Sequence, residues 1–164
     1  MSEHCHDRAS DVVNTVITAL KDVYGPGLDC PPLGGTTTTV RFFAGDGAPI
    51  EEIHCDSPLL WVRLMSRHRS VDFPEPDLIA SPCGAMDVIV LEVGVARCAD
   101  MDPTASVRAG EAEIALDDTW RISKAMCLVS SRLKNDHLVG TDVIEPYGPE
   151  GGVIAWTSTL YVSV

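Results

Sequence analysis

The chain has 164 residues, and its 12 Lys and Arg against 24 Asp and Glu give a formal net charge of −12. This length corresponds to one ordinary domain, and the acidic balance excludes a protein that binds nucleic acid mainly by neutralising phosphates. Hydrophobic residues make up 45% of the chain and charged residues 22%, which is typical of a folded globular protein. We therefore expect residues 1–164 to form a single domain with a flexible segment over residues 1–9.

Charged residues interrupt the most hydrophobic part of the chain. Asp87 and Glu92 lie within it, so no window reaches the roughly 18 apolar residues of a membrane span. The first eight residues also lack the basic and then apolar pattern of a secretory signal. We therefore expect a soluble protein that is made and folded in a cytoplasm.

The six cysteines are too few for a disulfide-stapled fold, and reduced thiols are the default expectation. Cys98 and Cys127 are expected to fill space in the core. Cys30 and Cys55 lie in consecutive loops and are the best candidates for a disulfide under oxidising conditions, although their spacing alone determines no pairing.

Apolar residues at three- and four-residue spacing predict a helix over about residues 10–24. Asp7 or Ser10 can cap its first turn, and Gly25 followed by Pro26 predicts a left-handed cap and an end. Five of the seven residues in the apolar stripe are β-branched, which makes the helix weak alone, so we expect it to pack on a sheet. The stripe comprises Val12, Val13, Val16, Ile17, Leu20, Val23 and Tyr24.

Three strands are predicted after this helix, over residues 36–43, 59–65 and 87–98. Pro- and Gly-rich connections separate them, and the connection over residues 71–84 contains three prolines. The third strand is mostly apolar on both faces, which is typical of a central strand that is covered on its two sides.

A second helix follows and ends near Leu133. Thr104 or Ser106 would cap a long version of this helix, and Asp117 or Asp118 would cap a short one. Asp117 and Asp118 are interpreted as capping residues and not as a catalytic pair, because neighbours on a helix diverge by ~100°.

Alternating apolar residues predict a last strand over residues 153–164, after a Pro- and Gly-rich stretch at residues 135–152. Strands that follow one another without crossover helices favour antiparallel pairing. The predicted class is therefore α+β, with an antiparallel or mixed four-stranded sheet, two helices packed on one face, and long Pro/Gly-rich loops.

Sequence signatures of catalysis are missing. The chain has no P-loop, dinucleotide fingerprint, Gly-x-Ser-x-Gly, His-Glu-x-x-His, EF-hand loop or Cys-x-x-Cys motif. His4, Cys5 and His6 are the densest group of metal-ligand types, but they lack the paired spacing of a zinc site. His54 and Cys55 resemble a catalytic pair, yet adjacent residues of an extended chain point to opposite faces. We predict no catalytic residue, no metal site and no cofactor.

Arg63, Arg67, His68 and Arg69 are the one concentration of basic residues. On a regular strand the three arginines lie on one side together with Trp61. A solvated face is the simplest interpretation, and a patch that docks on another acidic copy or on passing DNA is the alternative. An exposed aromatic residue flanked by Arg favours protein contact. The predicted interface residues are Trp61, Arg63, Arg67, Arg69, Tyr147 and Tyr161.

Three stretches and the order of elements carry a resemblance to a known family. The stretches are residues 88–98 (Val-Ile-Val-Leu-Glu-Val-Gly-Val-Ala-Arg-Cys), residues 116–120 (Leu-Asp-Asp-Thr-Trp) and residues 140–156. Together with the order helix, three strands, helix and closing strand, they resemble the tail terminator (tail completion) proteins of long-tailed bacteriophages, as found in phages of actinobacteria. The resemblance covers nearly the whole chain.

The resemblance implies a structural virion protein and not an enzyme. Such a protein binds the head-proximal end of the tail tube as a ring of six copies, ends tube polymerisation and joins the tail to the head connector. Its partners would be other copies of itself, the major tail tube protein and the head-tail connector protein, with no membrane. It would be assembled in the host cytoplasm and located in the virion at the head-tail junction.

Double-stranded DNA would pass through the lumen of this ring without specific binding, because a negative wall repels phosphate. Two other classes stay open. One is another head-to-tail connector, a stopper or an adaptor. The other is a small cytoplasmic Cys/His metal-binding protein or enzyme.

Overall fold

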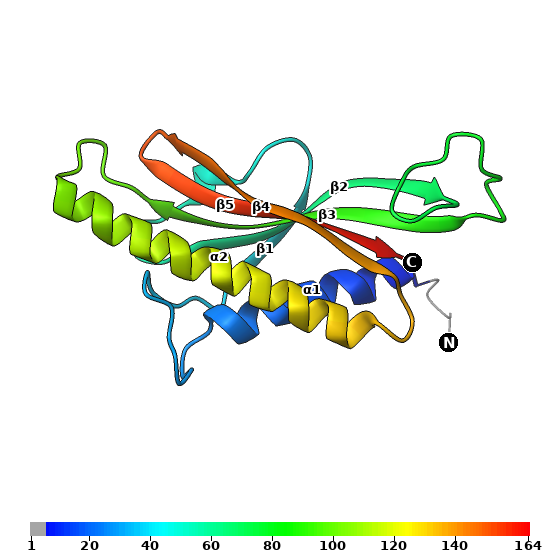
Figure 1. Ribbon diagram of the computed structural model, residues 1–164, viewed down its shortest axis with the longest axis horizontal. Helices are drawn as coiled ribbons and strands as arrows, with labels where there is room; N and C mark the ends of the chain where they lie inside the picture. Colours follow the sequence, from blue (N-terminus) through cyan, green and yellow to red (C-terminus); the bar gives the residue numbers. More distant parts are fainter. Residues whose placement is uncertain (1–5) are drawn as a thin grey trace.

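Two helices, α1 (Arg8–Tyr24) and α2 (Ala105–Leu133), lie on one face of a five-stranded sheet in the computed structural model, which describes residues 6–164 (Figure 1). The predicted α+β class with two helices is confirmed, and the sheet has five strands where four were predicted. The strands are β1 (Val40–Ala44), β2 (Leu59–Ser70), β3 (Met86–Cys98), β4 (Val139–Glu150) and β5 (Val153–Ser163).

The strand order in the sheet is β1-β2-β3-β5-β4. β1 pairs with β2 in parallel, and all other neighbouring strands are antiparallel, so the sheet is mixed. β3 is the central strand, as its two apolar faces predict. β1 and β4 are the two edges of the sheet, and the molecule therefore has two different sides.

α1 begins at the N-cap Asp7, whose carboxylate accepts a hydrogen bond from Ala9 N at 3.1 Å. Arg8 and Ala9, which belong to the predicted flexible segment, are already helical. The helix ends at Gly25, where the backbone is extended, with φ −69°, and not left-handed as predicted. A glycine is needed there because a Cβ would lie 2.6 Å from the Lys21 carbonyl oxygen, which accepts the Gly25 N–H.

The main core lies between the helices and the sheet. α1 packs toward β1 and β2, and α2 packs toward β3, β5 and β4. The apolar stripe of α1 is buried except for Ile17, which is partly buried, and this confirms the face that its periodicity predicts. Residues wholly buried in this core include Val12, Val16, Leu20, Leu60, Leu91, Ile122, Val129 and Leu160.

α2 is the long version of the predicted helix. The Thr104 hydroxyl caps it by accepting a hydrogen bond from Val107 N at 3.3 Å. Asp117 and Asp118 lie in the helix interior, so their interpretation as caps is wrong. No helix of the part of the chain that the structure describes is long and apolar enough to cross a membrane.

β4 occupies a segment, residues 135–152, that its prolines and glycines had marked as a loop. Pro146 and Pro149 donate no hydrogen bond to a ladder, and an edge strand tolerates this because one side of it has no strand partner. Two register shifts also break the pairing of β4 with β5. These irregularities remove the two-residue alternation that identifies a strand in a sequence.

A smaller apolar cluster lies on the opposite face of the sheet, beneath the segment of residues 45–58 (Figure 1). Trp61 of β2 is at its centre and has no exposed surface. Cys55 of this segment is bonded to Cys98 at the end of β3, and their Cα atoms lie 5.3 Å apart. The expectations of reduced thiols, and of Cys30 as the partner of Cys55, are therefore wrong.

Candidate functional site

A β-bulge divides the basic segment of β2 into two parts that face opposite sides of the sheet. The register shifts at Met65, which has no partner residue on β3. Before the bulge Arg63 lies opposite Glu92, and after it Arg67 lies opposite Ile89, a residue of the main core. One extra residue reverses the alternation of a strand. The prediction that the three arginines of β2 share one side is therefore wrong.

Trp61 and Arg63 belong to a polar cluster that residues 45–58 cover. Trp61 Nε1 donates to Glu92 Oε1 at 2.9 Å, and Arg63 donates to both oxygens of that carboxylate at 2.9 and 2.6 Å. Arg63 Nη1 also donates to Gly45 O at 3.1 Å. The Arg63 and Glu92 side chains are only 12% and 14% exposed. The predicted interface residues Trp61 and Arg63 are thus buried. Arg63 holds the covering segment on the sheet through its hydrogen bond to Gly45 O.

Arg67 connects β2, β3 and α1 on the helix face. Its Nη1 donates to Asp7 Oδ2 at 2.6 Å and its Nη2 to Asp87 Oδ2 at 2.8 Å. The hydrogen bonds to Asp87 and then Asp7 raise the pKa of Arg67, and those from Ala9 N and Arg67 lower the pKa of Asp7. The Arg67 side chain remains 42% exposed, so its role in an interface stays a prediction.

Arg69, Tyr161 and Tyr147 complete the predicted interface set, and their roles also stay predictions. Arg69 is partly buried, and its Nε has no hydrogen-bond partner within residues 6–164. Tyr161 pairs with Val90 on the face opposite the helices and is partly buried. Tyr147, on the edge strand β4, is 39% exposed, and the charge and hydrogen bond of Glu150 raise its pKa.

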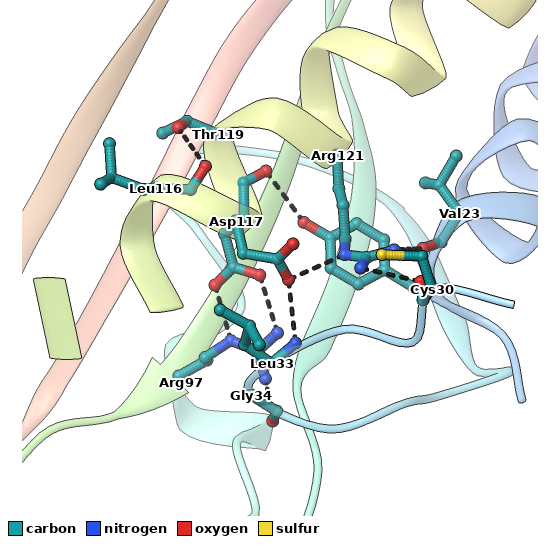
Figure 2. Close-up of polar contacts among 11 residues, drawn as sticks. Val23, Cys30, Leu33, Gly34, Arg97, Leu116, Asp117, Thr119 and Arg121 are labelled. Atoms are coloured by element: carbon teal, nitrogen blue, oxygen red, sulfur yellow. Dashed lines mark hydrogen bonds and ion pairs between the residues drawn. The ribbon is translucent and has the colours of Figure 1, made fainter. Parts of the chain in front are cut away.

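Figure 2 shows a second polar cluster, where α1, α2 and the end of β3 meet. Arg97 donates to both carboxylate oxygens of Asp118, at 2.6 and 2.7 Å, and to the Gly34 carbonyl. The two charged side chains are 11% and 3% exposed. The Tyr24 hydroxyl donates to Asp118 O at 3.2 Å, and burial followed by the Asp118 charge raises the pKa of Tyr24 well above its usual value.

Arg121 extends this cluster to the connection that follows α1 (Figure 2). Its Nε donates to Asp117 Oδ2 at 2.8 Å, and its Nη atoms donate to Val23 O and Cys30 O at 2.8 and 3.0 Å. Burial raises the pKa of Asp117, but the hydrogen bonds from Arg121 and Leu33 N outweigh it and the pKa is lowered. Two arginines therefore join α2 to the rest of the molecule.

The sequence held one signal for this cluster, the spacing of four residues between Asp117 and Arg121. The partner of Arg97 comes from another element, and no local pattern identifies it. The cavity beside Arg97 and Asp118 has a volume of about 40 Å³. That is room for about one water molecule, so we interpret the cluster as structural and not as a substrate site.

The disulfide bears on the candidate Cys/His pair. Cys55 is bonded to Cys98, so the pair with His54 has no thiol to act as a nucleophile. Cys127 is exposed, which corrects the expectation that it fills the core. The free cysteines among residues 6–164 are Cys30, Cys83 and Cys127.

Two of the three candidate metal ligands at the N-terminus, His4 and Cys5, lie outside the described residues. His6 Nε2 is 3.0 Å from Asp11 Oδ1, and both side chains are exposed. Within residues 6–164, no group of three His, Cys, Asp or Glu side chains is placed to hold a metal ion.

Two apolar grooves remain open on the helix side of the sheet. The α1 groove lies between α1 and strands β1 and β2 and has a volume of about 360 Å³. The α2 groove lies between the first half of α2 and strands β4 and β5 and has a volume of about 780 Å³. The α1 groove is lined by Val13, Ile17, Phe42, Leu64 and Ile89, and the α2 groove by Ala112, Ala115, Leu116, Ile144, Ile154 and Trp156.

Ion pairs within residues 6–164 engage most of the arginines but only a minority of the carboxylates. Six of the nine arginines form ion pairs with carboxylates, and the ion pairs of residues 6–164 engage eight of the 24 acidic residues of the chain. Most acidic side chains of residues 6–164 therefore lie outside these ion pairs, and the net charge of −12 makes the surface of one copy strongly negative.

No protein-family model matches the chain, and a comparison with curated proteins finds no significant match.

Proposed function

We propose that this chain is a structural virion protein that forms a ring at the head-proximal end of a phage tail tube, ends tube polymerisation and joins the tail to the head connector. The proposal starts from the resemblance of residues 88–98, 116–120 and 140–156 to tail terminator proteins. The observation that carries it is the presence of two unlike apolar grooves on the helix side of the sheet, one toward the β1 edge and one toward the β4 edge.

Unlike surfaces lead to a particular mode of association. A two-fold dimer uses the same patch on both copies, whereas contacts between different patches are head-to-tail and either close into a ring or grow into a filament. The α1 groove lies toward the β1 edge and the α2 groove toward the β4 edge, so each copy can contact one neighbour on each side. The number of six copies comes from the resemblance alone.

The β4 edge disfavours association by continued strand addition. An unprotected edge strand is a template for continued strand addition, and prolines are a common protection against it. Pro146 and Pro149 lie on this edge, which also carries two register shifts. Side chains and grooves, more than backbone pairing, would then make the contacts on this side.

The charge of the chain supports passage of DNA without retention. Each copy adds a formal charge of −12, and most carboxylates of the part that the structure describes lie outside its ion pairs. A ring of such copies presents a negative lumen, which repels phosphate over a distance of about 8–10 Å at physiological salt. A basic lumen would instead bind the DNA that has to move through it.

The test combines imaging with a polymerisation assay. Negative-stain electron microscopy and analytical ultracentrifugation of the purified chain should show annular particles with a central hole. Added to polymerising tail tube subunits of the same phage, the chain should bind tube ends and stop their growth. A chain that is monomeric and leaves tube growth unchanged contradicts the proposal, and binding to the head connector but not to tube ends would favour a stopper or an adaptor.

A further inference from the structure

The connection between β2 and β3 carries, near its middle, two apolar side chains that are almost fully exposed. Leu78 is 95% exposed and Ile79 is 96% exposed. Single exposed apolar residues are common on protein surfaces, but two adjacent ones with nearly complete exposure form a projecting hydrophobic pair. We refer to residues 77–80 as the tip.

The tip has a defined backbone conformation. Asp77 Oδ1 accepts hydrogen bonds from Ile79 N at 2.9 Å and Ala80 N at 3.1 Å, and Asp77 N donates to Arg69 O at 2.8 Å. An aspartate that bonds to the backbone two and three residues later stabilises a turn. A preorganised turn loses little conformational entropy on binding, so the exposed pair is suited to insertion into a partner.

The α2 groove is a receptor of matching character. Its volume is about 780 Å³, and apolar side chains from α2, β4 and β5 form most of its lining. Trp156 lines it, and the Trp156 Nε1–H is buried without a hydrogen-bond partner within residues 6–164. The indole ring therefore offers its apolar surface, and not its N–H group, to an occupant of the groove.

The tip cannot reach the groove of its own chain. The tip precedes the start of β3 at Met86, whereas Ile154 and Trp156 of the groove lie beside the other end of β3. The 13 residues of β3 span about 40 Å at the usual rise per residue. Figure 1 shows the β2–β3 connection, in green at the right, and the start of α2, at the left, at opposite ends of the long axis of the molecule.

The tip lies in an acidic segment, and one arginine lines the groove. Asp72, Glu75 and Asp77 make the segment of the tip acidic. Arg108 is exposed at the groove and belongs to none of the ion pairs of residues 6–164. The acidic residue at the groove, Glu111, accepts a hydrogen bond from Asp100 N at 2.9 Å. The lining thus carries one cation and one carboxylate, and Arg108 is the group that can pair with the acidic segment of a second copy.

We propose that the tip of one copy docks in the α2 groove of a second copy, with Leu78 and Ile79 packed among the apolar residues of α2, β4 and β5. Because donor and acceptor are different surfaces at opposite ends of the chain, the contact repeats head to tail. This inference rests on the proposed function, since it supplies the contact between neighbours in the ring.

A pair of defective variants tests the contact. In Leu78→Ser/Ile79→Ser the tip loses its apolar side chains, and in Ala112→Glu the groove gains a bulky charge on the surface of α2. Each variant should raise the dissociation constant of self-association roughly tenfold or more, because both changes fall at the centre of the contact. The controls are Val71→Ser in the same connection and Ser131→Glu on the same helix, and both should assemble as the unmodified chain does.

Mixing the two variants tests the head-to-tail geometry. The tip variant keeps an intact groove and the groove variant an intact tip, so an equimolar mixture should form a heterodimer that grows no further. Absence of this heterodimer would overturn the inference. A photo-crosslinking residue, Ile79→p-benzoylphenylalanine, should in addition form intermolecular cross-links to residues 108–119.

The outcomes separate the two proposals. Rings that bind tube ends, with tip variants that assemble normally and cross-links elsewhere, would overturn the docking contact and leave the proposed function intact. Tip-to-groove cross-links in assemblies that are not annular and do not bind tubes would support the contact and contradict the ring. A chain that stays monomeric at all accessible concentrations would overturn both.

Discussion

Trp61 lies directly against Gly94, its cross-strand partner on β3. A Cβ built on Gly94 would come within 2.1 Å of Trp61 Cζ2 and within 2.4 Å of Cε2, which is far closer than atoms can approach. The ring cannot move away, because Trp61 is wholly buried under residues 45–58 and donates a hydrogen bond to Glu92. The absence of a side chain at position 94 thus makes room for the largest buried residue of this face.

Gly94→Ala should lower the free energy of unfolding by roughly 2–3 kcal/mol, the usual cost of overpacking a core that cannot adjust. Urea denaturation monitored by circular dichroism measures the change.

Gly110→Ala is a matched control of opposite sign. Gly110 is in α2, and a Cβ there would have no neighbour within 4 Å. This variant should be about 0.5–1 kcal/mol more stable, because alanine favours a helix interior. A Gly94→Ala protein as stable as Gly110→Ala would show that Trp61 is not fixed in the orientation described here.

The buried ion pair of Arg97 and Asp118 should contribute far more to stability than an exposed pair. Asp118→Asn leaves the Arg97 guanidinium, 11% exposed, without its counter-charge, and we expect a loss of roughly 3 kcal/mol. Glu52→Gln breaks the exposed pair with Arg41 and should cost less than about 1 kcal/mol. Equal losses in the two variants, measured by urea denaturation, would contradict the structural role of the cluster.

Periodicity is sufficient to predict both helices, because its signal is local, whereas the candidate caps leave the start of α2 open. The buried stripe of α1 repeats at helical spacing, and Thr104 was one of the two caps considered for the long version of α2. The bulge at Met65 has no such signal, since neither Gly nor Pro marks it. Because the sequence gives no sign of this extra residue, the prediction places Arg67 and Arg69 on the wrong face of the sheet.

The candidate site was less predictable than the fold, because contacts between distant residues build it. Burial of Trp61 depends on a segment that precedes β2 in the chain and is held by the Cys55–Cys98 bond. The Arg97–Asp118 pair joins β3 to α2 across 21 residues. A single sequence contains no pattern for either pairing. The grooves are not predictable from it either, because they depend on how whole helices and strands pack.

Tyr24 should make the protein unstable in alkali. Its pKa is raised in the folded state by burial and by the Asp118 charge. The folded chain therefore keeps the phenol proton at a pH where the unfolded chain loses it, so the stabilisation is complete below about pH 10 and is lost as the pH rises further. We expect a loss of about 1.4 kcal/mol per pH unit above this point.

Tyr24→Phe removes the ionisable group and should abolish this slope, while the lost hydrogen bond to Asp118 O costs about 1 kcal/mol at neutral pH. Urea denaturation between pH 8 and pH 11 measures both effects, with the free thiols alkylated beforehand to prevent disulfide exchange. An unchanged alkaline slope in Tyr24→Phe would assign the instability to other groups.

The Cys55–Cys98 disulfide should stabilise the cover over Trp61. The bond closes a loop with a sequence separation of 43 residues, for which the restriction of the unfolded chain corresponds to roughly 3–4 kcal/mol. Cys55→Ser should lose this amount under oxidising conditions, and dithiothreitol should lower the stability of the unmodified chain to the same level. The reductant should leave Cys55→Ser unchanged, because no bond remains to be reduced.

Cys127→Ser, which changes an exposed free thiol, is the control and should remain as stable and as sensitive to the reductant as the unmodified chain. Insensitivity of the unmodified chain to dithiothreitol would show that the two cysteines are not bonded in solution. Residues 45–58 would then be attached to the sheet by the hydrogen bond from Arg63 to Gly45 O, by the Arg41–Glu52 ion pair and by apolar packing.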